Sequence, residues 1–69
     1  MKVRTDIYER VHGRKPRGRS YWRFQLVTHR VTEKDHFKNS RVDQTYESAL
    51  KEAQEVAARR KSDCIVVLP

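Results

Sequence analysis

The sequence predicts a small α+β protein in which one helix packs on one face of a sheet. Two runs that alternate between apolar and polar residues flank a loop that contains both glycines, a pattern typical of a strand hairpin. A later run carries apolar residues at helical spacing, and a short apolar run follows it. The predicted architecture is two-layered, with a three-stranded antiparallel sheet (β-β-β-α-β order), one helix and a C-terminal fourth strand. A chain of 69 residues is expected to form a single small domain, 1–69.

The first two predicted strands form the hairpin. Residues 3–11 alternate so that Ile7 would face the core and Tyr8 the opposite side. Residues 21–31 alternate again after the loop. The core-facing residues of this second strand are predicted to be Trp22, Phe24 and Leu26.

The second half of the chain changes period. Residues 37–42 are predicted to form a third strand after a polar turn, and residues 45–60 a helix. Thr45 suits the N-cap, because its hydroxyl can accept a hydrogen bond from an unpaired amide of the first turn. The run Cys64–Pro69 is apolar on both faces, which is typical of a strand buried on two sides. The predicted apolar stripe of the helix comprises Tyr46, Ala49, Leu50, Ala53, Val56 and Ala57.

Positive charge is concentrated in the first part of the chain. Residues 1–41 hold twelve Lys/Arg and four Asp/Glu, a net +8, whereas residues 42–69 hold four and five, a net −1. Residues 10–30 contain seven basic residues and no acidic one. This asymmetry favours a polyanion-binding half on a nearly neutral scaffold. A generic basic protein is the alternative, since charge alone indicates nonspecific binding rather than fold.

Candidate nucleic-acid-binding residues lie in the basic loop and on the sheet face that the helix would leave open. Basic side chains can contact phosphates, tyrosine rings can stack on unpaired bases, and Gln can bond base edges. An ordinary wet sheet face also carries Tyr and Arg for cross-strand packing, so that interpretation stays open. The candidates are Arg10, Arg14, Lys15, Arg17, Arg19, Tyr21, Arg23 and Gln25.

The loop segment KPRGRS, residues 15–20, resembles the core of an AT-hook, which is Pro-Arg-Gly-Arg-Pro flanked by basic residues. Ser20 replaces the second Pro. The resemblance implies that Arg17 and Arg19 enter an A·T-rich minor groove, whose negative potential attracts Arg. Contact of the same arginines with phosphates is the broader expectation.

The strand SYWRFQL, the next strand and the helix VDQTYESALKEAQEVA together resemble a DNA-binding domain of three strands and a helix. Such domains occur in plant AP2 factors and as integrase arm-binding domains of phages and transposons. The likeness covers about residues 7–58, and the C-terminal strand is not part of that domain. In that family the sheet lies in the DNA major groove, which implies base contacts by Arg10, Arg23 and Gln25. It implies phosphate contacts by Arg14, Lys15, Arg17 and Arg19.

The sequence does not indicate an enzyme, a cofactor or a metal site. Its three histidines lack the close spacing of zinc ligands, and no phosphate-cradling Gly loop or nucleophile elbow is present. His29 and His36 flank the predicted second turn and are the only candidates for the general base of a small ribonuclease. A polar loop histidine is the simpler interpretation.

A protein-interaction module with an acidic partner is the alternative function. One helix covers one sheet face, so part of the apolar C-terminal run would stay exposed, and such strips often mark interfaces. The exposed set would be Ile65 and Val67, or else Cys64, Val66 and Leu68. A homodimer through the C-terminal strand is possible on the same grounds.

Partner and compartment follow from composition. DNA is expected as a partner in preference to RNA, and no membrane is expected, since no apolar run approaches the ~20 residues of a span. The first residues lack the apolar core of a signal peptide, and the single cysteine cannot form an internal disulfide. These features predict a cytoplasmic protein.

Overall fold

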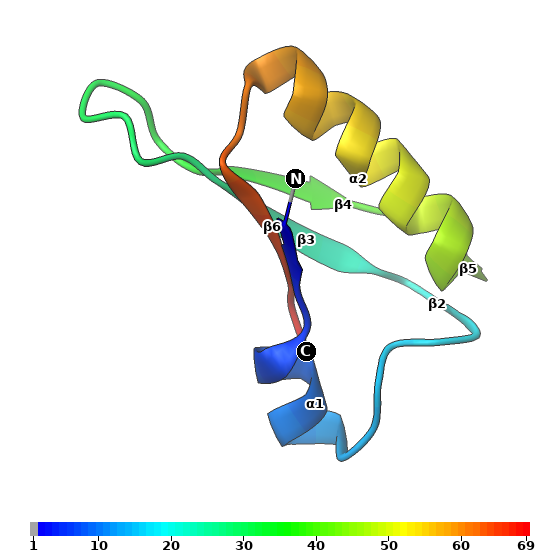
Figure 1. The fold of residues 1–69 in the computed structure, drawn as a ribbon. Helices are drawn as coiled ribbons and strands as arrows, with labels where there is room; N and C mark the ends of the chain where they lie inside the picture. The colour runs from blue at the N-terminus through cyan, green and yellow to red at the C-terminus, as the bar shows by residue number, and fades with distance from the viewer. Residues whose placement is uncertain (1) are drawn as a thin grey trace.

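The computed structural model describes residues 2–69, and within them the chain forms two helices and six short strands (Figure 1). Four strands make a mixed sheet in the order β1-β6-β3-β4, in which β6 runs parallel to β1 and antiparallel to β3. Strands β2 and β5 pair separately. The elements are β1 (Lys2–Arg4), α1 (Asp6–His12), β2 (Arg19–Ser20), β3 (Arg23–Val27), β4 (His36–Asn39), β5 (Gln44–Thr45), α2 (Tyr46–Arg60) and β6 (Cys64–Val67). The predicted α+β class is confirmed, but the three-stranded antiparallel sheet is wrong.

The predicted first strand is wrong beyond Arg4, because α1 occupies the rest of that segment. The helix has acidic residues in its first turn and basic residues in its last, which complements the helix dipole. Gly13, in the left-handed conformation at φ 71°, ends the helix by donating its N–H to the Glu9 carbonyl at 2.7 Å. Alternation therefore misled the prediction, since a segment this short fits either period.

The change from strand to helix reverses the predicted roles of two neighbouring residues. Tyr8, predicted to lie on the open face, is 7% exposed and belongs to the core, whereas Ile7 is 36% exposed. The Tyr8 ring packs against Trp22 with 5.7 Å between centroids. Helix α1 thus lies at the end of the sheet where β1 ends (Figure 1).

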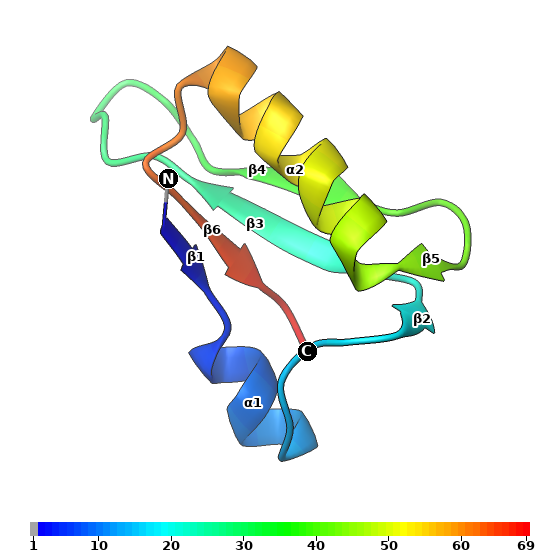
Figure 2. The same cartoon turned by 45° about the vertical axis from the view of Figure 1, so that its right-hand side comes forward.

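Helix α2 lies across one face of the sheet, as predicted (Figure 2). Thr45 is its N-cap, and the Thr45 Oγ1 accepts a hydrogen bond from the Ser48 N–H at 3.2 Å. The buried residues of α2 are Ala49, Ala53 and Ala57, and because their side chains are small the helix can approach the sheet closely. The core comprises Tyr8, Trp22, Phe24, Leu26, Ala49, Ala53, Ala57, Ile65 and Val67, with Leu50 half-buried against it. The predicted common core of strand and helix is therefore confirmed.

Strand β6 is an inner strand, flanked by β1 and β3. The register pairs Leu26 with Ile65 and Gln25 with Val66. Ile65 therefore faces α2, and Val66 faces the other side of the sheet, here called the open face. Both side chains are buried, at 0% and 4% exposure. The prediction of a strand buried on two sides is confirmed. The predicted exposed apolar strip is wrong, because Ile65, Val66 and Val67 are buried and Cys64 and Leu68 are partly buried.

Within residues 2–69, neither helix has the length and apolar character needed to cross a membrane.

Candidate nucleic-acid interface

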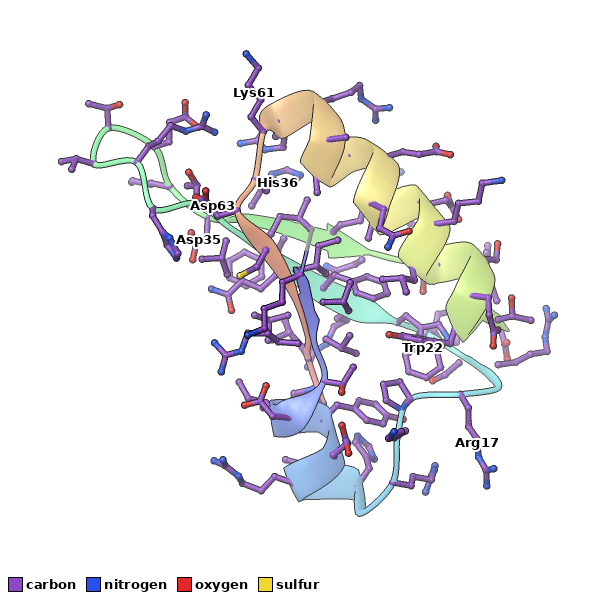
Figure 3. The ribbon with its side chains drawn as sticks, in the orientation of Figure 1. Arg17, Trp22, Asp35, His36, Lys61 and Asp63 are labelled. Atoms are coloured by element: carbon purple, nitrogen blue, oxygen red, sulfur yellow. The ribbon has the colours of Figure 1, made fainter. Side chains whose placement is uncertain are left out.

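The segment between α1 and β2 holds three of the eight predicted binding residues, Arg14, Lys15 and Arg17, on one anchored loop. Gly13 and Gly18 both adopt left-handed conformations, which turn the chain at each end of the segment. Pro16 is buried, and the Gly18 carbonyl accepts a hydrogen bond from the Tyr46 N–H at 2.9 Å. These anchors leave the side chains between them in solvent, and Arg17 points away from the body of the molecule (Figure 3). We call the exposed side chains of Arg10, Arg14, Lys15 and Arg17 the basic surface.

The charge of the basic surface is not neutralised within the chain. Across residues 2–69, none of its four side chains forms a salt bridge or a side-chain hydrogen bond to an acidic residue. The acidic residues of α1 are engaged elsewhere, since Glu9 accepts a hydrogen bond from the Thr5 hydroxyl and Asp6 pairs with Arg4 at 3.1 Å. The Arg4 guanidinium also lowers the pKa of Asp6. The four cations therefore face solvent without forming an ion pair, although the charge of Arg10 also contributes to the lowered pKa of Asp6.

Arg19 differs from Arg17 although both belong to the hook-like sequence. Arg19 lies in β2, and its Nε is 3.3 Å from the Asp43 Oδ1. Its Nη2 donates to the Asp43 carbonyl at 3.0 Å. The two arginines are therefore not equivalent, because only Arg17 is free of internal partners among the described residues.

The remaining predicted contacts on the sheet also have internal partners. Arg23 donates to the Pro69 carbonyl at 3.1 Å, and the Gln25 amide donates to the Asp35 Oδ2 at 2.8 Å. Neither group is fully available to a base edge. The predicted binding residues are therefore divided between two places. The basic surface lies on α1 and the loop that follows it, and Arg23 and Gln25 lie on β3.

The open face is more apolar than the alternation predicted. The register places Arg4, Val66, Gln25 and Phe37 in one row across it. Val66 is buried at the centre of the row, and Phe37 on edge strand β4 is 56% exposed. The predicted open-face residues Tyr8 and Arg10 are absent from this face, because both belong to α1.

Tyr21 lies at an irregularity between the two strand ladders that sequence reasoning missed. Trp22 exchanges two hydrogen bonds with Ser40: its N–H donates to Ser40 Oγ at 2.7 Å, and its carbonyl accepts from the Ser40 N–H at 2.8 Å. The next pair joins Ser20 to Gln44. Between these pairs Tyr21 lies opposite the three residues 41–43, outside the strands, so the two ladders meet across a β-bulge with two extra residues.

Two residues of this bulge add to the candidate site. Val42 is 61% exposed and Arg41 is also exposed. The predicted third strand over residues 37–42 is wrong beyond Asn39, because β4 ends there and residues 40–43 form the bend opposite Tyr21.

The acidic residues at the other end of β3 hold a loop together. Asp35 accepts hydrogen bonds from the Thr28 N–H at 2.9 Å and from the Gln25 amide, and these bonds lower its pKa. Asp63 accepts from the His29 N–H at 2.6 Å. Figure 3 shows both carboxylates at the end of the sheet opposite Arg17.

Within the described part of the chain, no three His, Cys, Asp or Glu side chains are grouped to hold a metal ion. Residues 2–69 also enclose no pocket.

Comparison with known proteins returns no relatives. No protein-family model, no curated protein and no solved structure matches the chain.

Proposed function

We propose that this chain binds nucleic acid by contact of the basic surface with phosphates. The observation that carries the proposal is a set of four exposed, unpaired cations, three on a loop that is anchored at both ends and one, Arg10, on the helix that precedes it. A fixed loop loses little conformational entropy when its side chains engage a ligand. Phosphate contacts of this kind supply affinity and position, and they carry no sequence information directly.

Duplex DNA is the partner that the sequence resemblances favour, and the geometry supports the phosphate-contact part of that interpretation. Minor-groove insertion would use Arg17 together with Arg19, and Arg19 is engaged with Asp43. Reading of bases by the sheet would use Arg23 and Gln25, which have internal partners. We therefore propose binding with weak dependence on sequence.

The test is a salt series of fluorescence anisotropy with duplex and single-stranded oligonucleotides. The salt slope is the steepness with which the logarithm of the binding constant falls as the logarithm of the salt concentration rises. We expect the triple variant Arg14→Gln, Lys15→Gln, Arg17→Gln to lower this slope by about 2 to 3, since each lost phosphate contact removes roughly 0.7 to 0.9. The matched control is Lys51→Gln, Arg59→Gln, Arg60→Gln on α2, which removes the same charge from exposed positions. Equal weakening by both triple variants would show a general charge effect and contradict the proposal.

A second candidate function is a protein-interaction module that uses the open face. Its support is Phe37, which is 56% exposed on edge strand β4, with Gln25 between it and the buried Val66. Because β6 is an inner strand, a homodimer through it would use side chains of the open face and not a free backbone edge. We expect sedimentation equilibrium to show self-association that Phe37→Ser weakens. A monomer at all concentrations would exclude the homodimer.

A further inference from the structure

The β-bulge presents Tyr21 as an exposed ring on a rigid base. The ring is 67% exposed, and across residues 2–69 it packs against no other aromatic ring. The other two tyrosines, Tyr8 and Tyr46, both pack against Trp22. Tyr21 is therefore not part of the core, and its aromatic ring is left in solvent.

Trp22 fixes the backbone behind Tyr21. Its side chain is 2% exposed, and its indole Nε1 donates to the Gln44 carbonyl at 2.9 Å. The Tyr46 ring meets it edge-on, with 5.1 Å between centroids. The salt bridge of Arg19 to Asp43 closes the other side of the bulge. A bulge so anchored re-aims one side chain without making it mobile.

The surroundings of Tyr21 suit a nucleotide. Val42 and Arg41 lie in the bend between β4 and β5 that is opposite Tyr21, and both are exposed. Arg23 begins β3 two residues after Tyr21, and its guanidinium donates to the Pro69 carbonyl. An aromatic ring opposite an apolar side chain and Arg41 provides a surface for a base and a cation for a phosphate that flanks it.

We propose that Tyr21 is a stacking platform for an unpaired base, so that the nucleic acid is single-stranded where it crosses the bulge. This inference rests on the proposed function and specifies its ligand. Bases within a duplex are already stacked on their neighbours, and their faces are closed to a side chain. A single strand offers a free face at each base, and stacking of this kind tolerates any sequence.

The experiment compares two single-stranded DNA oligonucleotides of about twelve nucleotides, a length within the usual range for such proteins. One is oligo-dT, and the other carries abasic positions with the same number of phosphates. We expect the wild-type protein to bind oligo-dT more tightly. Tyr21→Ala is expected to lose about 5- to 150-fold in affinity for oligo-dT and little for the abasic strand. Tyr21→Phe is expected to restore the preference.

The control is Phe37→Ala, which removes another exposed aromatic ring, on the open face. Fluorescence of Trp22, the single tryptophan, reports whether each variant is folded. The inference is overturned if wild type binds both strands equally, or if Tyr21→Ala weakens both equally. Binding that responds to the basic-surface triple variant and not to Tyr21→Ala would retain the proposed function and exclude the platform. Absence of binding to any oligonucleotide would exclude both.

Discussion

Tyr8 and Trp22 pack against each other with 5.7 Å between their ring centroids. Tyr8 comes from α1, and Trp22 immediately precedes β3. This contact joins the short first helix to the core formed by the sheet and α2. Because the basic loop follows α1 directly, the orientation of the basic surface depends on the same contact.

Tyr8→Ala is therefore expected to destabilise the fold, by about 3 kcal/mol, because a large buried ring is lost and a cavity is left. Urea unfolding followed by Trp22 fluorescence measures the change. The control is Ile7→Ala, which is expected to cost much less, since Ile7 is 36% exposed. A larger loss for Ile7→Ala would restore the strand predicted from alternation and contradict the helix.

Arg17 and Arg19 are expected to differ in function. Arg17→Ala should weaken nucleic-acid binding and lower the salt slope by roughly 0.7 to 0.9, because one phosphate contact is lost. Arg19→Ala should change binding less, since its guanidinium is engaged with Asp43. Its cost to stability is expected to be below about 1 kcal/mol, as for other exposed salt bridges. Equal salt slopes for the two variants would instead favour paired, hook-like insertion.

Thr45→Ala is expected to destabilise the protein by about 1 kcal/mol, because the Ser48 N–H loses its hydrogen bond at the start of α2. Thermal unfolding by circular dichroism measures the loss. Thr45→Ser keeps the hydroxyl and is the control, with stability expected near that of wild type. An equal loss for both variants would assign the effect to packing and not to the cap.

Asp35 is expected to contribute to acid unfolding. Hydrogen bonds from the Thr28 N–H and the Gln25 amide lower its folded-state pKa below the ordinary value of 3.8. A lowered folded pKa means that the carboxylate stabilises the fold above the unfolded pKa. That contribution is lost as the pH falls through the folded pKa.

Urea unfolding measured at a series of pH values from neutral to strongly acidic tests this expectation. Asp35→Asn should be less stable than wild type at neutral pH, and its stability should decrease less as the pH falls below about 4. Asp6, whose pKa is lowered by the Arg4 guanidinium, remains in this variant and accounts for part of the remaining slope. Parallel pH profiles for wild type and variant would contradict the role assigned to Asp35.

The sequence alone determined the features that depend on local pattern. Helix α2, its Thr45 cap and its apolar stripe follow from a period of 3.6 sustained over four turns. The C-terminal strand follows from an apolar run long enough to be buried on both faces. The exposure of the basic loop follows from its charge and its glycines, because its Lys and Arg side chains stay in solvent and Pro16 alone is buried.

The tertiary structure decided the features that depend on residues distant in sequence. The segment of residues 6–12 is too short for its periodicity to distinguish a helix from a strand. In the structure it is a helix whose Tyr8 packs on Trp22. The same holds for the candidate site. Arg19, Arg23 and Gln25 have partners 24, 46 and 10 positions away, and no local pattern identifies such partners. The bulge at Tyr21 likewise exists only because two strand ladders meet out of register, since the register is set by pairing between strands and not within one.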